Sequence, residues 1–116
     1  MNTRKVGATY EKFGAEYLKD KGYRIIELNF FCRVGEIDII ALKDNYICFV
    51  EVKYRKNIKA GYPEEAVSYS KMKKICKASQ FYLYCHKQYN RLQPRFDVMA
   101  IEGDVVRYYE NAFPYV

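Results

Sequence analysis

The sequence lacks several features that would place it in a specialised class. No apolar run approaches the roughly 20 residues needed to cross a bilayer, and the first twenty residues are studded with charge instead of forming an apolar secretory signal. The four cysteines, Cys32, Cys48, Cys76 and Cys85, lack the paired short spacing of a zinc ribbon. We therefore expect a cytoplasmic protein with reduced cysteines and no membrane association.

The sequence also lacks internal boundaries. It has no repeat, no low-complexity run and no linker rich in proline or glycine, so residues 1–116 are expected to form one domain. A chain of this length can bury one modest core, and half of its residues are hydrophobic, as in globular proteins. Tryptophan is absent, whereas tyrosine occurs 13 times. These tyrosines could fill the edges of a small core or stack on nucleic-acid bases.

The net charge of +6 is concentrated in one segment. Residues 53–77 contain eight basic and two acidic side chains, and the rest of the chain is balanced. A localised basic field suggests a polyanionic partner, usually nucleic acid. A solvated, lysine-rich helix face would have the same composition.

Hydrophobic periodicity predicts an α/β protein in which a helix and three strands precede a second helix and two strands. The expected bounds are 7–21 for the first helix, 23–31, 36–42 and 46–54 for the strands, 64–86 for the second helix, and 95–101 and 105–109 for the last strands. Ser70 is a candidate N-cap within the second helical pattern. A strand–helix–strand crossover after a three-strand meander implies a mixed central sheet flanked by helices.

The hairpin around the Asp44-Asn45 loop brings charged residues together. Its register places Asp38 opposite Glu51 and Glu36 opposite Lys53, all on one face of the sheet. The other face is expected to carry Ile37, Ile39, Val50 and Val52.

The predicted opposition of Asp38 and Glu51 creates an electrostatic conflict. Directly opposed residues have Cβ atoms about 5 Å apart, where like charges repel. Such carboxylates need a proton, a cation or full solvation, and Mg²⁺ binds through one or two carboxylates plus water. The alternative is an ordinary wet sheet face. Against it, the same face continues as an apolar surface, which favours a cleft; its residues are Ile40, Leu42, Ile47 and Phe49.

These residues resemble a known enzyme motif. Asp38, followed after twelve residues by Glu51-Val52-Lys53, resembles the D…(D/E)-x-K core of the PD-(D/E)XK nuclease superfamily, although Ile37 stands where the superfamily's name has proline. A wider set of motifs is similar to the YraN-like family of predicted endonucleases, which is related to Holliday-junction resolvases. This set comprises Gly14-Ala15-Glu16-Tyr17-Leu18, Gly22-Tyr23, Asn29, Gly35-Glu36-Ile37-Asp38, Phe49-Val50-Glu51-Val52-Lys53, Arg55, Pro63, Ala66-Val67, Lys71 and Arg95-Phe96-Asp97-Val98.

The resemblance implies a restriction-endonuclease-like domain and a set of site residues. Asp38, Glu51 and the Val52 carbonyl would bind Mg²⁺ or Mn²⁺, and Lys53 would orient the attacking water. Glu16 matches an additional acidic residue of the superfamily, although it could equally be a solvent-exposed helix residue.

A second helical motif extends the resemblance. Gln80-x-x-x-Tyr84 is similar to the Q-x-x-x-Y motif of the RecB-like branch, so both side chains could reach the site or the DNA.

The function expected from the resemblance is a metal-dependent endonuclease for branched or single-stranded DNA in repair or recombination, and a homodimer would place two sites on opposing strands. The expected DNA-binding residues are Arg55, Lys56, Lys59, Lys71, Lys73, Lys74, Lys77 and Tyr84. Two alternatives remain open: a non-catalytic nucleic-acid-binding accessory protein and a nuclease that acts on RNA.

Overall fold

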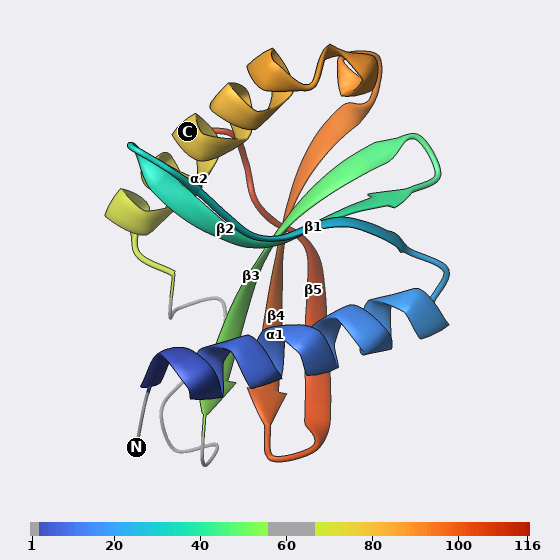
Figure 1. The fold of residues 1–116 in the computed structure, drawn as a ribbon, viewed down its shortest axis with the longest axis vertical. Helices are drawn as coiled ribbons and strands as arrows, with labels where there is room; N and C mark the ends of the chain where they lie inside the picture. The colour runs from blue at the N-terminus through green and yellow to red at the C-terminus, as the bar shows by residue number, and fades with distance from the viewer. Residues whose placement is uncertain (1–2, 56–66) are drawn as a thin grey trace.

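The computed structural model describes residues 3–55 and 67–116. The elements are α1 (Thr3–Asp20), β1 (Arg24–Cys32), β2 (Gly35–Lys43), β3 (Tyr46–Arg55), α2 (Tyr69–Cys85), the short 3₁₀ helix η3 (Lys87–Tyr89), β4 (Gln93–Glu102) and β5 (Val105–Phe113). This order confirms the predicted α/β arrangement (Figure 1). Residues 64–66, where the second helix was expected to begin, lie outside the described residues.

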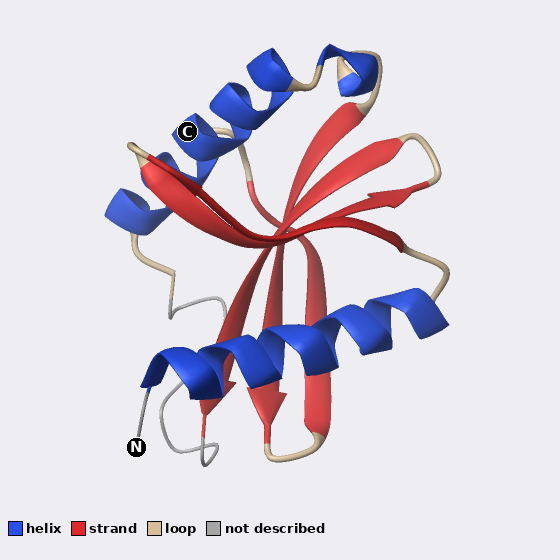
Figure 2. Cartoon of the chain, in the orientation of Figure 1, coloured by secondary structure: helices blue, strands red, loops and turns tan. Residues whose placement is uncertain are grey.

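The five strands form one mixed sheet in the order β1-β2-β3-β4-β5 (Figure 2). β3 and β4 are parallel, and the other neighbours are antiparallel. Parallel neighbours need a long connection, and the crossover through α2 provides it. Among residues 3–55 and 67–116 no helix is long and apolar enough to cross a membrane.

The two long helices cover opposite faces of the sheet. Ile40, Ile47 and Phe49 pack with residues of α2, and alternate strand residues pack with Leu18 of α1. At Gly14, a Cβ atom would lie only 2.6 Å from the sulfur of Met99, so glycine lets α1 approach the sheet closely.

α2 begins at a cap two residues earlier than expected. Ser68 has extended backbone angles (φ −70°, ψ 159°), and its hydroxyl accepts a hydrogen bond from the N–H of Lys71 at 3.1 Å. Ser70 therefore lies in the first turn, and its assignment as the N-cap is wrong. Ser68 satisfies one of the N–H groups that a helix leaves unpaired at its start.

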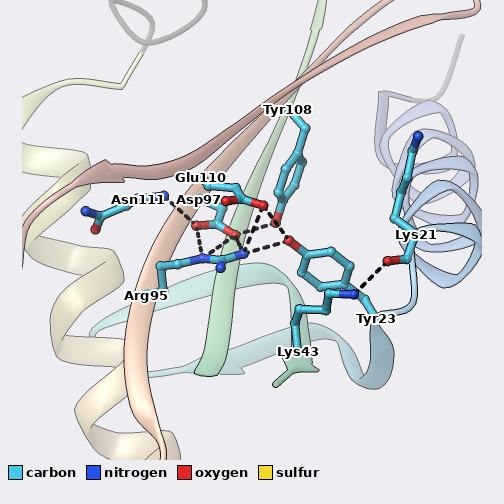
Figure 3. A network of polar contacts seen from close by, with 8 residues as sticks. All are labelled: Lys21, Tyr23, Lys43, Arg95, Asp97, Tyr108, Glu110 and Asn111. Carbon is cyan, nitrogen blue, oxygen red and sulfur yellow. Dashed lines mark hydrogen bonds and ion pairs between the residues drawn. The ribbon is translucent and has the colours of Figure 1, made fainter. Parts of the chain in front are cut away.

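A buried ion pair joins β4 to its neighbours at the end of the sheet shown in Figure 3. Asp97 is fully buried, and the guanidinium of Arg95 donates to its carboxylate at distances down to 2.8 Å. Tyr108 on β5 donates to the same carboxylate at 2.5 Å, and the N–H of Asn111 does so at 2.9 Å. Arg95 also donates to the hydroxyl of Tyr23 at 2.7 Å. The network ties β5 and the start of β1 to β4.

Replacing Asp97 should be strongly destabilising. Asp97→Ala leaves the Arg95 guanidinium buried without its partner, so we expect the free energy of unfolding to fall by about 3–5 kcal/mol in urea titrations. Asp97→Asn keeps hydrogen-bonding capacity and should cost less. The control is Glu102→Ala, which removes a half-exposed pair with Arg107 at 4.0 Å and should cost below about 1 kcal/mol. Equal losses in Asp97→Ala and Glu102→Ala would show that the network does not stabilise the sheet.

Candidate functional site

The predicted register of the β2–β3 hairpin is confirmed over residues 39–43 and 46–50, and this ladder ends at Ile39 and Val50. Beyond it, the N–H of Val52 donates to Oδ2 of Asp38 at 2.8 Å. The Asp38 side chain thus takes a donor that a backbone carbonyl would take in a regular ladder. The direct opposition expected for Asp38 and Glu51 is therefore replaced by a side-chain contact one residue further along β3.

The alternation of side chains between the two faces of the sheet shifts in β1 and β2, next to the point where this ladder ends. Leu28 pairs with Ile39, and Phe30 pairs with Ile37. Between these pairs Asn29 has φ 55°, a left-handed conformation that asparagine tolerates better than most residues. Ile39 packs on the α1 side, whereas Phe30 and Ile37 pack on the α2 side. The expectation that Ile37 and Ile39 share a face is wrong, because the alternation of side chains shifts between them.

Glu51 lies at the centre of the candidate site with 5% of its surface exposed. The Nζ atoms of Lys53 and Lys71 lie 3.6 and 3.7 Å from its Oε1 atom, longer than a normal hydrogen bond. Its Oε2 atom is buried and has no hydrogen-bond partner in the described part of the chain. Lys53 therefore pairs with Glu51, whereas its expected partner Glu36 is exposed.

A third carboxyl group, that of Glu11, reaches the site from α1. Asp38 and Asn29 are its polar neighbours, and the left-handed backbone of Asn29 marks the shift in β1. Oε2 of Glu11 is also buried and unpartnered within residues 3–55 and 67–116. The site thus combines side chains from both helices and from neighbouring strands.

Burial and mutual repulsion hold these carboxyl groups near neutrality. Burial, followed by the negative charge of Asp38, raises the pKa of Glu51 to about 7, although Lys71 and Lys53 oppose the shift. The same two causes, in the same order, raise the pKa of Glu11 to about 7. Burial also raises the pKa of Asp38. Near pH 7 the site therefore retains protons that a cation could displace.

The remaining predicted site residues divide into those near Glu51 and those elsewhere. Asp38, Val52, Lys53 and Lys71 are brought together with Glu51. Glu16 is not among them: its side chain is exposed and pairs with Lys19 at 3.3 Å. The expectation that Glu16 borders the carboxylates is not met.

Gln80 and Tyr84 lie on the exposed side of α2, opposite its buried residues. The Lys87 ammonium lies 5.6 Å from the centroid of the Tyr84 ring. The structure describes no contact between Gln80 and the carboxylates. Lys73, Lys74 and Lys77 are also exposed on α2. Lys56, Lys59 and the side chain of Arg55 lie outside the described residues.

Sequence reasoning missed Glu11, although a signal for it exists. Gly14, Ala15 and Leu18 are buried, and Glu11 precedes them at the i, i+3, i+4, i+7 spacing of one helix face. A carboxylate on that buried face is the unusual feature, whereas Glu16 lies off it. Asn29 and Lys71 belong to the motif set that carries the family resemblance, but their contacts in the site depend on how β1 and α2 pack.

The donor set is compatible with a hard divalent cation. The described residues contain no group of three or more His, Cys, Asp or Glu side chains arranged to hold a metal by themselves. Mg²⁺, however, is commonly held by one or two carboxylates with water and substrate oxygens. The unpartnered Oε2 of Glu51 lies beside the negative charge of Asp38. An ion at this position would offset the cost of burying a charged carboxylate and the repulsion between the two side chains.

The fold and site define an α/β protein whose mixed sheet carries a buried carboxylate cluster between its two long helices. The sequence matches the family described as "Uncharacterised protein family UPF0102" over residues 10–101, and the chain belongs to this family. This confirms the family resemblance seen in the sequence.

Three relatives match most of the chain. A UPF0102 protein of Lachnoclostridium phytofermentans is 41% identical over 97% of this chain and 96% of its own length. A UPF0102 protein of Caldanaerobacter subterraneus is 46% identical over 87% of this chain and 82% of its own length. A UPF0102 protein of Fusobacterium nucleatum is 44% identical over 96% of this chain and 92% of its own length.

The raised pKa of Glu51 predicts how stability depends on pH without divalent ions. Between its ordinary pKa of 4.5 and its folded value of about 7, the folded protein holds a proton that the unfolded chain has lost. Stability is therefore present at pH 4.5 and is lost as the pH rises through 7. The loss attributable to Glu51 is at most about 3 kcal/mol. Urea titrations in EDTA between pH 5 and 8 measure it.

Glu51→Gln should flatten this pH dependence, leaving a smaller slope from Glu11. Glu102→Gln, a carboxylate on β4 outside the cluster, should keep the parental slope. A parental stability that is constant or rises from pH 5 to 8 would contradict the predicted charge state of the site.

The left-handed backbone of Asn29 makes a second prediction for this site. Asn29→Ala places a Cβ-bearing residue with poor left-handed propensity at φ 55°, whereas Asn29→Gly accepts that conformation freely. The alanine variant should be less stable than the glycine variant by about 1 kcal/mol in urea titrations. If the Asn29→Ala variant proves at least as stable as the Asn29→Gly variant, the shift in side-chain alternation in β1 does not depend on this backbone conformation.

Proposed function

We propose that the protein is a metal-dependent endonuclease of the PD-(D/E)XK type that hydrolyses DNA phosphodiester bonds with Mg²⁺ or Mn²⁺. The observation that carries the proposal is the buried carboxylate pair of Asp38 and Glu51 beside two lysines, with Oε2 of Glu51 unpartnered among the described residues. A protein that only bound nucleic acid would gain nothing from this pair, because carboxylates weaken the attraction of nearby cations for phosphate.

Asp38 and Glu51 would hold the ion, together with water and the Val52 carbonyl. The hydrogen bond from the N–H of Val52 fixes the Asp38 carboxylate. Glu11, which lies beside Asp38 on α1, would support this ligand and release its proton when the ion binds. A bound Mg²⁺ or Mn²⁺ would lower the pKa of a water molecule and offset the charge that develops on the phosphate.

Lys53 on β3 and Lys71 on α2 would both act on the phosphate. Both ammonium groups already lie beside Oε1 of Glu51, so each can reach a phosphate bound at the same ion. Lys53 would orient the attacking water, and both lysines would stabilise the negative charge of the transition state.

The exposed lysines of α2 support nucleic acid as the substrate class. Lys73, Lys74 and Lys77 lie on the same helix as Lys71, and such cations bind the phosphate backbone without selecting a sequence. We therefore propose branched or single-stranded DNA, in repair or recombination, as the substrate. RNA cleavage and metal-independent binding by an accessory protein are the competing outcomes.

The test incubates the purified protein with junction, flap, single-stranded and plasmid DNA, and with a matched RNA strand, in Mg²⁺, Mn²⁺ or EDTA. Asp38→Ala and Glu51→Ala should reduce metal-dependent cleavage by at least about 100-fold, because each removes charge stabilisation at the reacting phosphate. Glu11→Gln should raise the Mg²⁺ concentration needed for half-maximal rate by about 10- to 100-fold. Glu16→Gln, the same change on the exposed side of α1, should have no effect.

Thermal unfolding provides a control that is independent of turnover. Mg²⁺ should raise the melting temperature of the parent and not that of the Asp38→Ala, Glu51→Ala double variant. If the single variants cut as fast as the parent, the activity belongs to another site or to a contaminant. Salt-sensitive DNA binding without metal-dependent cleavage would favour the accessory protein, and cleavage of RNA alone would make RNA the substrate.

A further inference from the structure

A hollow of about 390 Å³ lies between the β1–β2 turn and the start of α2. Its volume is within the range of about 300–1,000 Å³ found for small-ligand pockets. Lys71 forms part of its wall, and the same ammonium group lies 3.7 Å from Oε1 of Glu51. The hollow therefore adjoins the position at which a phosphate would be cut.

The turn and the helix that form this hollow are packed closely. A Cβ atom at Gly35 would lie 3.1 Å from the carbonyl oxygen of Lys74, a tight contact that glycine avoids. The approach brings Arg33 from the turn and Lys74 from the helix to the same hollow. Glu36 is the acidic side chain in its wall, and it is outnumbered by Arg33, Lys71 and Lys74. The hollow is therefore suited to a phosphate-bearing ligand.

The hollow also has an aromatic wall that the core does not need. Phe31 lines it with 68% of its surface exposed. Its neighbour Phe30 is half-buried, with its ring centroid 5.0 Å from that of Tyr82 and 6.4 Å from that of Phe81. The aromatic packing between β1 and α2 thus uses Phe30 and leaves the ring of Phe31 to solvent. Val34, 42% exposed, also lines the hollow, so exposed apolar surface lies directly beside its cations.

Exposed aromatic rings beside cations bind nucleotides by stacking on the base while the cations hold the phosphate. In a duplex both faces of each base are covered by neighbouring base pairs, so a ring such as that of Phe31 can stack only on a base that is unpaired. We propose that the hollow binds an unpaired nucleotide adjacent to the cleaved phosphate, with its base on Phe31 and its phosphate at Arg33 and Lys74. Its position relative to the cut rests on the proposed function, whereas nucleotide binding itself does not.

Binding is measured in EDTA at fixed salt, where no cleavage occurs, by the fluorescence anisotropy of a labelled single-stranded oligonucleotide and of the duplex of the same sequence. Phe31→Ala should weaken binding of the single strand by about 5- to 100-fold and leave binding of the duplex unchanged. Tyr115→Ala removes another aromatic side chain of similar exposure, 55%, outside the hollow, and should change neither.

The absence of tryptophan from the chain allows stacking to be observed directly. Phe31→Trp introduces an indole into the hollow that can be excited at a wavelength where the 13 tyrosines do not absorb. Its emission should be quenched by the single strand, because indole stacks on bases at least as well as phenyl. Tyr115→Trp is the matched control and should not be quenched. The circular dichroism spectrum and melting temperature of each variant establish that it is folded.

The outcomes separate this inference from the proposed function. Single-strand binding by Phe31→Ala equal to that of the parent, or an unquenched tryptophan at position 31, overturns the inference even if the protein cleaves DNA. Equal losses of single-strand and duplex binding overturn the preference for an unpaired base. A selective loss of single-strand binding together with quenching supports the nucleotide site, even where metal-dependent cleavage is absent and the proposed endonuclease activity fails.

Discussion

The hydrogen bond from the N–H of Val52 to Asp38 is the contact on which the arrangement of the site depends. A regular ladder would have continued past Val50 and placed Asp38 and Glu51 side by side. At Asn29, which has a left-handed backbone, the alternation of side chains shifts. The Asp38 carboxylate there accepts a hydrogen bond from the N–H of Val52 on β3. The ladder between β2 and β3 consequently ends just before Asp38 and Glu51. Glu11 from α1 then lies beside Asp38, and Lys71 from α2 lies beside Glu51.

The buried carboxylates of Asp97 and Glu51 differ in how completely their hydrogen-bonding capacity is satisfied. Asp97 is fully buried, yet Arg95, Tyr108 and the N–H of Asn111 all donate to it (Figure 3). Glu51 is almost as buried, but its two lysine contacts are long, and its Oε2 atom has no partner in the described part of the chain. Buried polar atoms are nearly always hydrogen-bonded, and exceptions often mark functional positions. Asp97 is thus a structural carboxylate, whereas Glu51 retains capacity for a ligand.

The sequence predicts elements and register better than it predicts the site, for identifiable reasons. Periodicity sets which face of each element is buried, and the turn at Asp44-Asn45 sets the pairing of β2 with β3. The conformation of Asn29 was not predictable, because asparagine permits a positive φ without requiring it. The choice of Glu16 over Glu11 has a different cause: Glu11 shares a helix face with Gly14, Ala15 and Leu18, and the prediction did not use this spacing.

The crossover between β3 and β4 explains why the basic helix lies beside the acidic cluster. Because β4 is parallel to β3, α2 must pass back over the sheet, and its first turn brings Lys71 to the segment of β3 that holds Glu51. In this arrangement Lys53 and Lys71 partly neutralise Glu51 when no other cation is bound. In the proposed function, a divalent ion at the carboxylates would leave both ammonium groups free to interact with a phosphate. Under that proposal the same lysines would stabilise Glu51 before substrate binds and the bound phosphate afterwards.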